Sequence, residues 1–360
     1  MVAVGVTALA LVPEAVAHRP LSGSGISAAT LLERINASEA AGYSGYAESV
    51  GTLSLPQADQ LDEVDDVGAL FGGRTQLRVW WRGAADWRLD TLTPFGESDV
   101  HRDASGTWTW DYERSRATRT TVFTESQLRL PDAVDLLPPE VGRRLLSEAG
   151  PEEVTRVGSR AIAGVTAAGL RLVPAEKQSS ISRVDVWADP DTGLTLRVDV
   201  YASAKAAAVS TTFLDLDQSR PAASATAFAL PATARLSERG DRDLLSGIDR
   251  YTDASPPATL AGLAGIRRVD AQSVGVYGRG VTSLVLTPLP YSIGDELRTT
   301  LATLSGPPKV GTRVLAAFGP VHVLLLTDRG GRYWLLSGTV TEATLQRAAD
   351  ELSANPPQRR

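Results

Sequence analysis

Residues 77–112 read LRVWWRGAADWRLDTLTPFGESDVHRDASGTWTWDY, and this stretch decides the fold. Apolar and polar residues alternate with a period of two in successive runs, first around Val79, then around Leu89, then from Thr107 onward. Such alternation predicts half-buried antiparallel strands. The segment 103–106, Asp-Ala-Ser-Gly, has the composition of a hairpin turn. Strands that are neighbours in sequence are therefore expected to be neighbours in the sheet.

The large apolar residues of these runs are interpreted as one face of the sheet. The residues assigned to that face are Leu77, Val79, Trp81, Trp87, Leu89, Trp108 and Trp110. Two short helical covers are not expected to bury so much apolar area on a single-layer sheet, so we predict an apolar ligand site against these side chains. Packing into a core is the alternative for each tryptophan. Trp80 shares its parity with Arg78 and Arg82, so it is expected to face away from that core or toward a ligand.

Further strands and two helical patches complete a first domain over residues 26–235. Ser27 is a predicted N-cap, and apolar residues at helical spacing follow it in residues 28–35. A second helical patch lies within 132–151, and the clearest hairpin spans 181–202. Roughly ten antiparallel strands with these helices predict a curved α+β domain.

A smaller α+β domain is predicted over residues 259–354. The segment 236–258 is polar and ends in two prolines, as inter-domain linkers do. Helices are expected at 292–304 and 341–354, with strands between them, and 355–360 is expected to be a tail.

The first 25 residues resemble the remnant of a signal peptide or membrane anchor followed by a linker. An apolar run over residues 2–12 precedes Ala15-Val16-Ala17, a pattern that signal peptidase accepts. No Lys or Arg precedes Arg19, so we favour a start codon lying further upstream. The expected location is extracytoplasmic.

Composition excludes several classes of function. The chain of 360 residues carries 36 basic and 42 acidic residues, a net charge of −6, which argues against nucleic acid as a partner. With no cysteine, thiolate metal sites and cysteine nucleophiles are excluded. The three histidines, His18, His101 and His322, have no ligand-like spacing, so we expect neither a metal nor a cofactor.

Catalytic motifs are missing or incomplete. Residues 42–46, Gly-Tyr-Ser-Gly-Tyr, miss the nucleophile pattern G-x-S-x-G by one position, and residues 278–280, Gly-Arg-Gly, lack the third glycine of a dinucleotide loop. Residues 189–193 look like a calcium loop but lack its downstream Glu, so a hairpin turn is the better interpretation. His101 and His322 fall in strand-like segments. We therefore expect no catalytic residues and no enzymatic activity.

Residues 77–112 are similar to the strand-rich half of the LolA-type lipoprotein-carrier superfamily, in a pattern typical of its actinobacterial members. The hairpin at 182–201, with Asp-Pro-Asp-Thr-Gly at its turn, looks like the later part of the same fold. The second domain, with VYGRG at 276–280 and DRGG at 328–331, resembles that of two-domain sigma-E regulatory proteins of the MucB/RseB type.

The resemblance implies a half-barrel sheet whose concave face is covered by helices and forms an apolar cavity for acyl chains. It also implies that the small C-terminal domain helps to engage a membrane-bound anti-sigma factor. The leading hypothesis is an extracytoplasmic regulatory protein that senses a lipid or lipoprotein. The alternatives are a carrier that transports such a ligand and, with less support, a hydrolase whose serine or carboxylate pair converges in a cleft.

Overall fold

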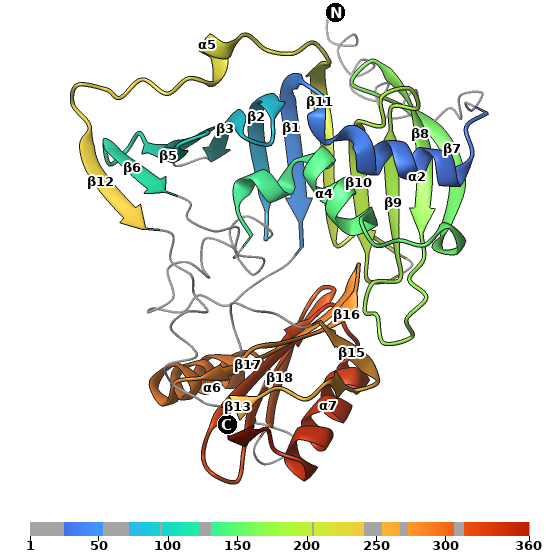
Figure 1. The fold of residues 1–360 in the computed structure, drawn as a ribbon, viewed down its shortest axis with the longest axis vertical. Helices are drawn as coiled ribbons and strands as arrows, with labels where there is room; N and C mark the ends of the chain where they lie inside the picture. The colour runs from blue at the N-terminus through green and yellow to red at the C-terminus, as the bar shows by residue number, and fades with distance from the viewer. Residues whose placement is uncertain are drawn as a thin grey trace, which may run out of the picture.

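The computed structural model describes residues 25–52, 72–93, 96–121, 131–203, 205–240, 254–266, 273–305 and 313–359. In Figure 1 the chain forms a large curved sheet with helices across one face, and a smaller sheet with its own helices lies below it. The predicted fold class, a curved and mainly antiparallel sheet followed by a smaller α+β domain, is confirmed.

Among the described residues, twelve strands form the first sheet. From one edge to the other the order is β12 (Arg235–Gly240), β6 (Arg116–Thr121), β5 (Gly106–Asp111), β4 (Gly96–Asp103), β3 (Asp86–Thr93), β2 (Arg74–Gly83), β1 (Tyr43–Gly51), β11 (Val209–Asp217), β10 (Thr195–Tyr201), β9 (Arg183–Ala188), β8 (Val165–Leu172) and β7 (Val154–Ile162). The edge strands β12 and β7 are far apart in this order, so the sheet stays open, as a half-barrel does.

One pairing corrects the sequence prediction. β12 pairs parallel with β6, whereas we expected only antiparallel strands and placed residues 236–240 in the linker. The composition of β12, Arg-Leu-Ser-Glu-Arg-Gly, is that of a polar edge strand, which periodicity does not distinguish from a linker. The segment that leads from β11 to β12 contains the short helix α5 (Ala223–Thr226) and arches along one end of the sheet (Figure 1).

Helical segments cover one face of the first sheet. They are α2 (Ala28–Ala37), η1 (Ser38–Ala40), η2 (Ala133–Leu136), α4 (Pro138–Leu146) and η3 (Pro151–Glu153). As predicted, the Ser27 side chain caps α2 by accepting a hydrogen bond from the Thr30 amide at 3.1 Å. Asp132 caps η2 in the same way, and prolines occupy the first two positions of α4.

The apolar side of this cover packs on one face of the sheet. Leu31, Leu32 and Ile35 of α2 lie in one cluster with Val186 of β9 and Val198 of β10. Val186 and Val198 are register partners in the hairpin of β9 and β10. Both alternate with charged residues along their strands, as expected for strands with one buried face.

The second domain has a seven-stranded sheet among the described residues. Its order is β14 (Thr259–Leu260), β15 (Leu263–Ile266), β16 (Gly275–Arg279), β17 (Thr282–Leu289), β20 (Tyr333–Gly338), β19 (Val321–Thr327) and β18 (Arg313–Phe318). The helices α6 (Tyr291–Ser305) and α7 (Glu342–Ala354) match the two predicted helices within one residue at either end. Leu324 packs in the cluster of α7 and Leu325 in that of α6, so the helices lie on opposite faces.

Two short elements tie the ends of the second domain together. β13 (Ala254–Ser255) pairs with β21 (Gln358–Arg359), so part of the predicted linker and part of the predicted tail form a small ladder. Pairing between segments so distant in sequence cannot be seen from local patterns. The predicted N-terminal segment lies outside the described residues, apart from Gly25. None of the described helices has the length and apolarity needed to cross a bilayer.

The two domains contact each other through backbone hydrogen bonds. Ser179 forms a β-bridge with Val340, and the Ser180 amide donates to the Thr339 carbonyl at 3.0 Å. The Thr341 amide in turn donates to the carbonyl of Gln178 at 2.7 Å. A loop of the first domain therefore runs alongside the segment that precedes α7.

Candidate functional site

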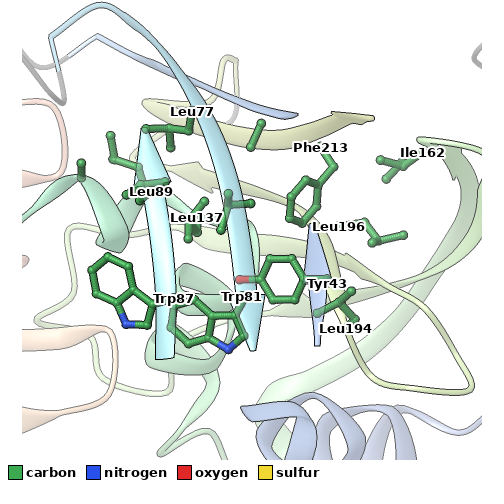
Figure 2. Packing of buried hydrophobic residues seen from close by; sticks show 14 of the residues in the cluster. Tyr43, Leu77, Trp81, Trp87, Leu89, Leu137, Ile162, Leu194, Leu196 and Phe213 are labelled. Atoms are coloured by element: carbon green, nitrogen blue, oxygen red, sulfur yellow. The ribbon is translucent and has the colours of Figure 1, made fainter. Parts of the chain in front are cut away.

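An aromatic row crosses three neighbouring strands on the covered face of the first sheet. Register places Tyr43 of β1 beside Trp81 of β2, and Trp81 beside Trp87 of β3. Tyr43 and Trp81 stack with ring centroids 5.9 Å apart, and Trp81 and Trp87 stack at 5.8 Å with their planes 6° apart. Figure 2 shows the three rings side by side. Stacked rings held by strand register form a flat, rigid apolar surface.

Five of the seven predicted site residues lie on this face, where they are 0 to 8% exposed. They are Leu77, Val79, Trp81, Trp87 and Leu89. The cover supplies Ala133, Leu136 and Leu137 to the same cluster, so the five side chains pack on one another and on the η2–α4 segment. The cover is thus more complete than the strand pattern indicated, and a ligand must displace part of it.

Polar atoms without partners interrupt this apolar cluster. The hydroxyl of Tyr43, the indole N–H of Trp81 and the hydroxyl of Thr195 are buried and have no hydrogen-bond partner in the described part of the chain. Leaving a buried donor unpaired costs about 1 to 3 kcal/mol. The two aromatic donors sit on adjacent rings of the row, where an added acceptor would satisfy them.

Two charged groups of α4, Glu140 and Arg143, act on the Tyr43 hydroxyl. Burial raises the pKa of Tyr43 well above its usual value, and the Glu140 carboxylate adds to that rise. Burial also raises the pKa of Glu140, against the effect of Arg143, with which it forms an ion pair one turn along α4. The Tyr43 hydroxyl is therefore a neutral donor at physiological pH.

A hollow opens at the end of the row, where η1 faces the turn between β2 and β3. Its volume is about 590 Å³, and Asn36, Glu39, Arg82, Asp86 and Arg220 contribute its polar rim. The Trp87 indole N–H donates to the Ala84 carbonyl in the same turn at 3.2 Å. The hollow has the volume of a typical small-molecule site, and Ala84 connects its wall to Trp87 of the row.

Two predicted site residues, Trp108 and Trp110, lie on the opposite face of the sheet. The two-residue turn between β4 and β5 pairs Arg102 with Thr107, which places Trp108 beside His101 and Trp110 beside Asp99. The assignment of both tryptophans to the covered face is therefore wrong. The length of the β4–β5 turn, rather than the hydrophobicity of the two tryptophans, decides on which face of the sheet they lie.

The opposite face has its own aromatic contacts. Phe228, from the segment between β11 and β12, stacks on Trp108 with ring centroids 5.1 Å apart, and it also contacts His101. Trp80 lies under the Arg88 guanidinium, 5.0 Å from the ring centroid, which confirms that it faces away from the covered core. Aromatic residues on this side pack against a crossing segment and arginines rather than against the helices.

Sequence reasoning did not include Tyr43 in the site. The residue lies in a strand whose composition, Tyr-Ser-Gly-Tyr-Ala-Glu-Ser-Val-Gly, shows weak alternation. The sequence predicts the strand but not that Tyr43 belongs to the site. Tyr43 joins the row through its register with Trp81, and the sequence does not determine that register. The residues of η2 were predicted as helical but not as part of the site.

Neither of the two histidines that the structure describes shows a catalytic arrangement. His101 Nδ1 lies 2.8 Å from the Thr226 carbonyl, and burial lowers its pKa even though this hydrogen bond opposes the effect. His322 Nδ1 lies 2.5 Å from the Val340 carbonyl. Each imidazole therefore uses one nitrogen on a backbone carbonyl.

A cleft of about 370 Å³ between the domains is lined by serines and by His322. Ser180 donates to the Pro320 carbonyl, and Ser182 donates to the Tyr201 carbonyl at 3.0 Å. Among the described residues, no serine of this cleft is hydrogen-bonded to His322. The pairing of nucleophile and base that a serine hydrolase needs is thus not formed here.

Comparison with solved structures bears on the fold. A chain of the Pseudomonas aeruginosa MucA/MucB complex is 18% identical, with a TM-score of 0.50, over 89% of this chain and 96% of that chain. A LolA superfamily protein from Nitrosomonas europaea is 8% identical over 56% of this chain and 98% of its own, with a TM-score of 0.25. LprF from Mycobacterium bovis is 9% identical over 60% of this chain and 100% of its own, with a TM-score of 0.32.

The likeness to the MucA/MucB chain confirms the predicted resemblance at the level of the fold, because it covers both domains. No family model matches the chain. No curated protein matches its sequence.

Proposed function

We propose that this chain is an extracytoplasmic binding and regulatory protein that takes up an acyl chain, from a lipid or lipoprotein, against the aromatic row. The observation that carries the proposal is the pair of unpartnered donors, the Tyr43 hydroxyl and the Trp81 indole N–H, on a stacked apolar surface. An acyl ester or amide has a carbonyl oxygen that accepts hydrogen bonds beside an apolar tail. Such a ligand matches both features of the row.

The hollow between η1 and the β2–β3 turn supplies the route of entry. Ala84 lines the hollow and accepts a hydrogen bond from the Trp87 indole N–H, and the rim carries the side chains of Arg82 and Arg220. The acyl chain passes from this hollow along Trp87 and Trp81 as the η2–α4 cover lifts. Each large side chain of the row that is covered by ligand rather than by protein keeps roughly 1.5 to 3 kcal/mol of burial energy. The cost of the exchange is therefore the exposure of the cover's own residues, Leu136 and Leu137.

The second domain makes regulation a better proposal than simple carriage. Arg279, at the end of β16, donates to the Glu148 carbonyl at 2.8 Å, and the Gly280 amide donates to the Glu148 carboxylate at 2.8 Å. Glu148 lies two residues after the last residue of α4. Displacement of the cover is thereby transmitted to the second domain.

The partner proposed to receive this signal is a membrane-bound protein of the anti-sigma type. A solved neighbour that covers both domains is a chain of the MucA/MucB complex, which supports a protein partner for this fold. A carrier would release its ligand to an acceptor, whereas a regulator would retain the partner. Co-purification of a membrane protein with the intact chain separates the two.

No catalytic step is part of the proposal, because His101 and His322 each spend a ring nitrogen on a backbone carbonyl. The experiment that tests binding is a titration of the intact chain with a diacylated lipopeptide, followed by tryptophan fluorescence. Trp81→Ala is expected to abolish the spectral shift, and Trp110→Ala, on the opposite face, is expected to preserve it. Equal shifts in both variants would contradict the proposed site.

A further inference from the structure

A cluster of carboxylates lies on the face of the first sheet opposite the aromatic row. Register places Asp90 of β3 directly beside Asp99 of β4, and the two are only 1% and 2% exposed. Glu97 lies two residues before Asp99 on the same strand and therefore on the same face. One carboxylate oxygen from each of the three residues lies within 4.8 Å of the others.

Arg88 neutralises this cluster only in part. Its guanidinium donates to both oxygens of Asp90, at 2.6 and 2.9 Å, and to Oδ2 of Asp99 at 2.9 Å. Tyr112 donates its hydroxyl to the same Oδ2 at 3.1 Å. Arg78 is the register partner of Asp90 on β2, but it is exposed and forms no ion pair with the cluster among the described residues. Three carboxylates and the one paired guanidinium leave two negative charges, which one divalent cation balances.

Asp99 Oδ1 is buried and has no hydrogen-bond partner among the described residues. In two other buried aspartates on this face, by contrast, both carboxylate oxygens have hydrogen-bond partners. Arg171 donates to both oxygens of Asp185, at 2.6 and 2.7 Å. Asp199 accepts from Ser210 at 2.6 Å and from Arg197 at 3.1 Å, one on each oxygen.

A buried carboxylate oxygen that accepts nothing is costly, and in native proteins such an atom calls for a ligand or an ion. A cation held by these carboxylates would give Asp99 Oδ1 a partner and would balance the remaining charge of the cluster.

We propose that Asp90, Glu97 and Asp99 form a binding site for a hard divalent cation, with Ca²⁺ the favoured ion. The donors are all oxygens, which excludes the soft metals that need thiolate or imidazole. Ca²⁺ accepts irregular shells completed by water, whereas Mg²⁺ demands near-octahedral geometry. Glu97 is partly exposed and leaves access for that water. Because Arg88 offsets one carboxylate, the expected dissociation constant is about 0.1 to 1 mM, the range of extracellular modules.

This site departs from our expectation of no metal, which rested on the scarcity of histidine and cysteine. A carboxylate site assembled across two strands leaves no spacing motif, because Asp90 and Asp99 meet only through the β3–β4 register. The site is separate from the aromatic row, and it does not depend on the proposed function.

The test is calorimetric titration of CaCl₂, and separately of MgCl₂, into the intact, chelator-treated chain. Terbium gives a second readout, since Trp110 and Tyr112 lie beside Asp99 and sensitise the luminescence of a bound lanthanide. We expect one Ca²⁺ per chain and weaker Mg²⁺ binding. Replacing a direct ligand is expected to lower the Ca²⁺ affinity by at least about tenfold. Removing a residue that only hydrogen-bonds to a metal's ligands already lowers metal affinity by about that factor.

Asp99→Asn and Glu97→Gln are the diagnostic variants. Glu97 is partly exposed, so Glu97→Gln still tests the site if the substitution of the buried Asp99 impairs folding. Glu48→Gln is the matched control, an acidic residue of β1 paired with Arg74 on the same sheet. Reduced Ca²⁺ affinity and reduced terbium luminescence in the two variants but not in the control support the site. Absence of Ca²⁺ binding in the millimolar range, or unchanged affinity in both variants, would overturn it.

Discussion

Arg279 Nη1 lies 2.8 Å from the carbonyl oxygen of Glu148, and this contact joins the second domain to the loop that follows the cover helix. The same guanidinium forms ion pairs with Glu153 at 2.9 Å and Glu176 at 2.8 Å. One side chain therefore holds three groups of the first domain.

Arg279→Ala is expected to loosen the second domain without unfolding either sheet. Hydrogen bonds to charged groups are worth about 1.5 to 3 kcal/mol when buried, and less for this partly exposed guanidinium because solvent screens it. Calorimetry should show the single transition of the intact chain broadening or splitting in two. Arg298→Ala, which removes an exposed pair with Asp295 on α6, is the control and should change little. A single, unshifted transition in Arg279→Ala would show that this residue does not couple the domains.

Acid should weaken the same contact. Burial by itself raises the pKa of Glu153, but hydrogen bonds from Arg279 and from the Gly150 and Ala175 amides outweigh it, so the pKa is lowered. A carboxyl whose pKa is lower in the folded state stabilises that state above its unfolded pKa of about 4.3 and loses this effect as the pH falls through the lowered value. Denaturant unfolding of wild type and Glu153→Gln should therefore differ at neutral pH and converge in acid. A difference that persists in acid would assign the effect to packing.

The cover should be sensitive to one added methyl group. Gly142 of α4 lies so close to β10 that a Cβ atom there would meet Thr195 Oγ1 at 2.5 Å. Gly142→Ala is expected to destabilise the chain by about 1 to 3 kcal/mol and to expose the covered face. Increased binding of an apolar fluorescent dye measures the exposure. Gly158→Ala, where nothing lies within 4 Å, is the matched control and should leave dye binding unchanged.

Asp99→Asn should stabilise the chain at neutral pH when a chelator is present. The folded-state pKa of about 6 is above the ordinary aspartate value, so the fold loses stability as the pH rises from about 4 to about 6. The variant removes that loss, which amounts to at most about 3 kcal/mol. Thermal unfolding in EDTA should place the variant above wild type at pH 7, with the gap closing near pH 4. A variant less stable than wild type at pH 7 would show that Asp99 is adequately paired by Arg88.

Local patterns were sufficient for much of the fold. The Ser27 cap, the two helices of the second domain and the alternating strands all follow from residues near one another in sequence. What the sequence did not determine is register. Trp108 and Trp110 look like core residues, yet the register set by the β4–β5 turn places Thr109 on the covered face. Trp108 therefore packs on Phe228 and Trp110 on Tyr112, on the opposite face.

The candidate site was predicted in part for the same reason. Trp81 and Trp87 were identified because each alternates with charged residues in its own strand. Tyr43 completes the row only through its pairing with Trp81, although more than twenty residues separate β1 from β2 in sequence. Likewise, Asp90 and Asp99 belong to different strands. Neither their burial nor the lack of a hydrogen-bond partner for Asp99 Oδ1 can be predicted before the strands are paired.

The central claim, that the covered face of the first domain binds an acyl chain, is tested most directly by native mass spectrometry of the intact chain incubated with a diacylated lipopeptide. The account predicts a complex of one lipopeptide per chain, retained in Trp110→Ala and lost in Trp81→Ala. It also predicts that Gly142→Ala forms the complex faster, because its cover is displaced. Only ligand-free chain at saturating lipopeptide, or equal complex formation by Trp81→Ala and wild type, would contradict it.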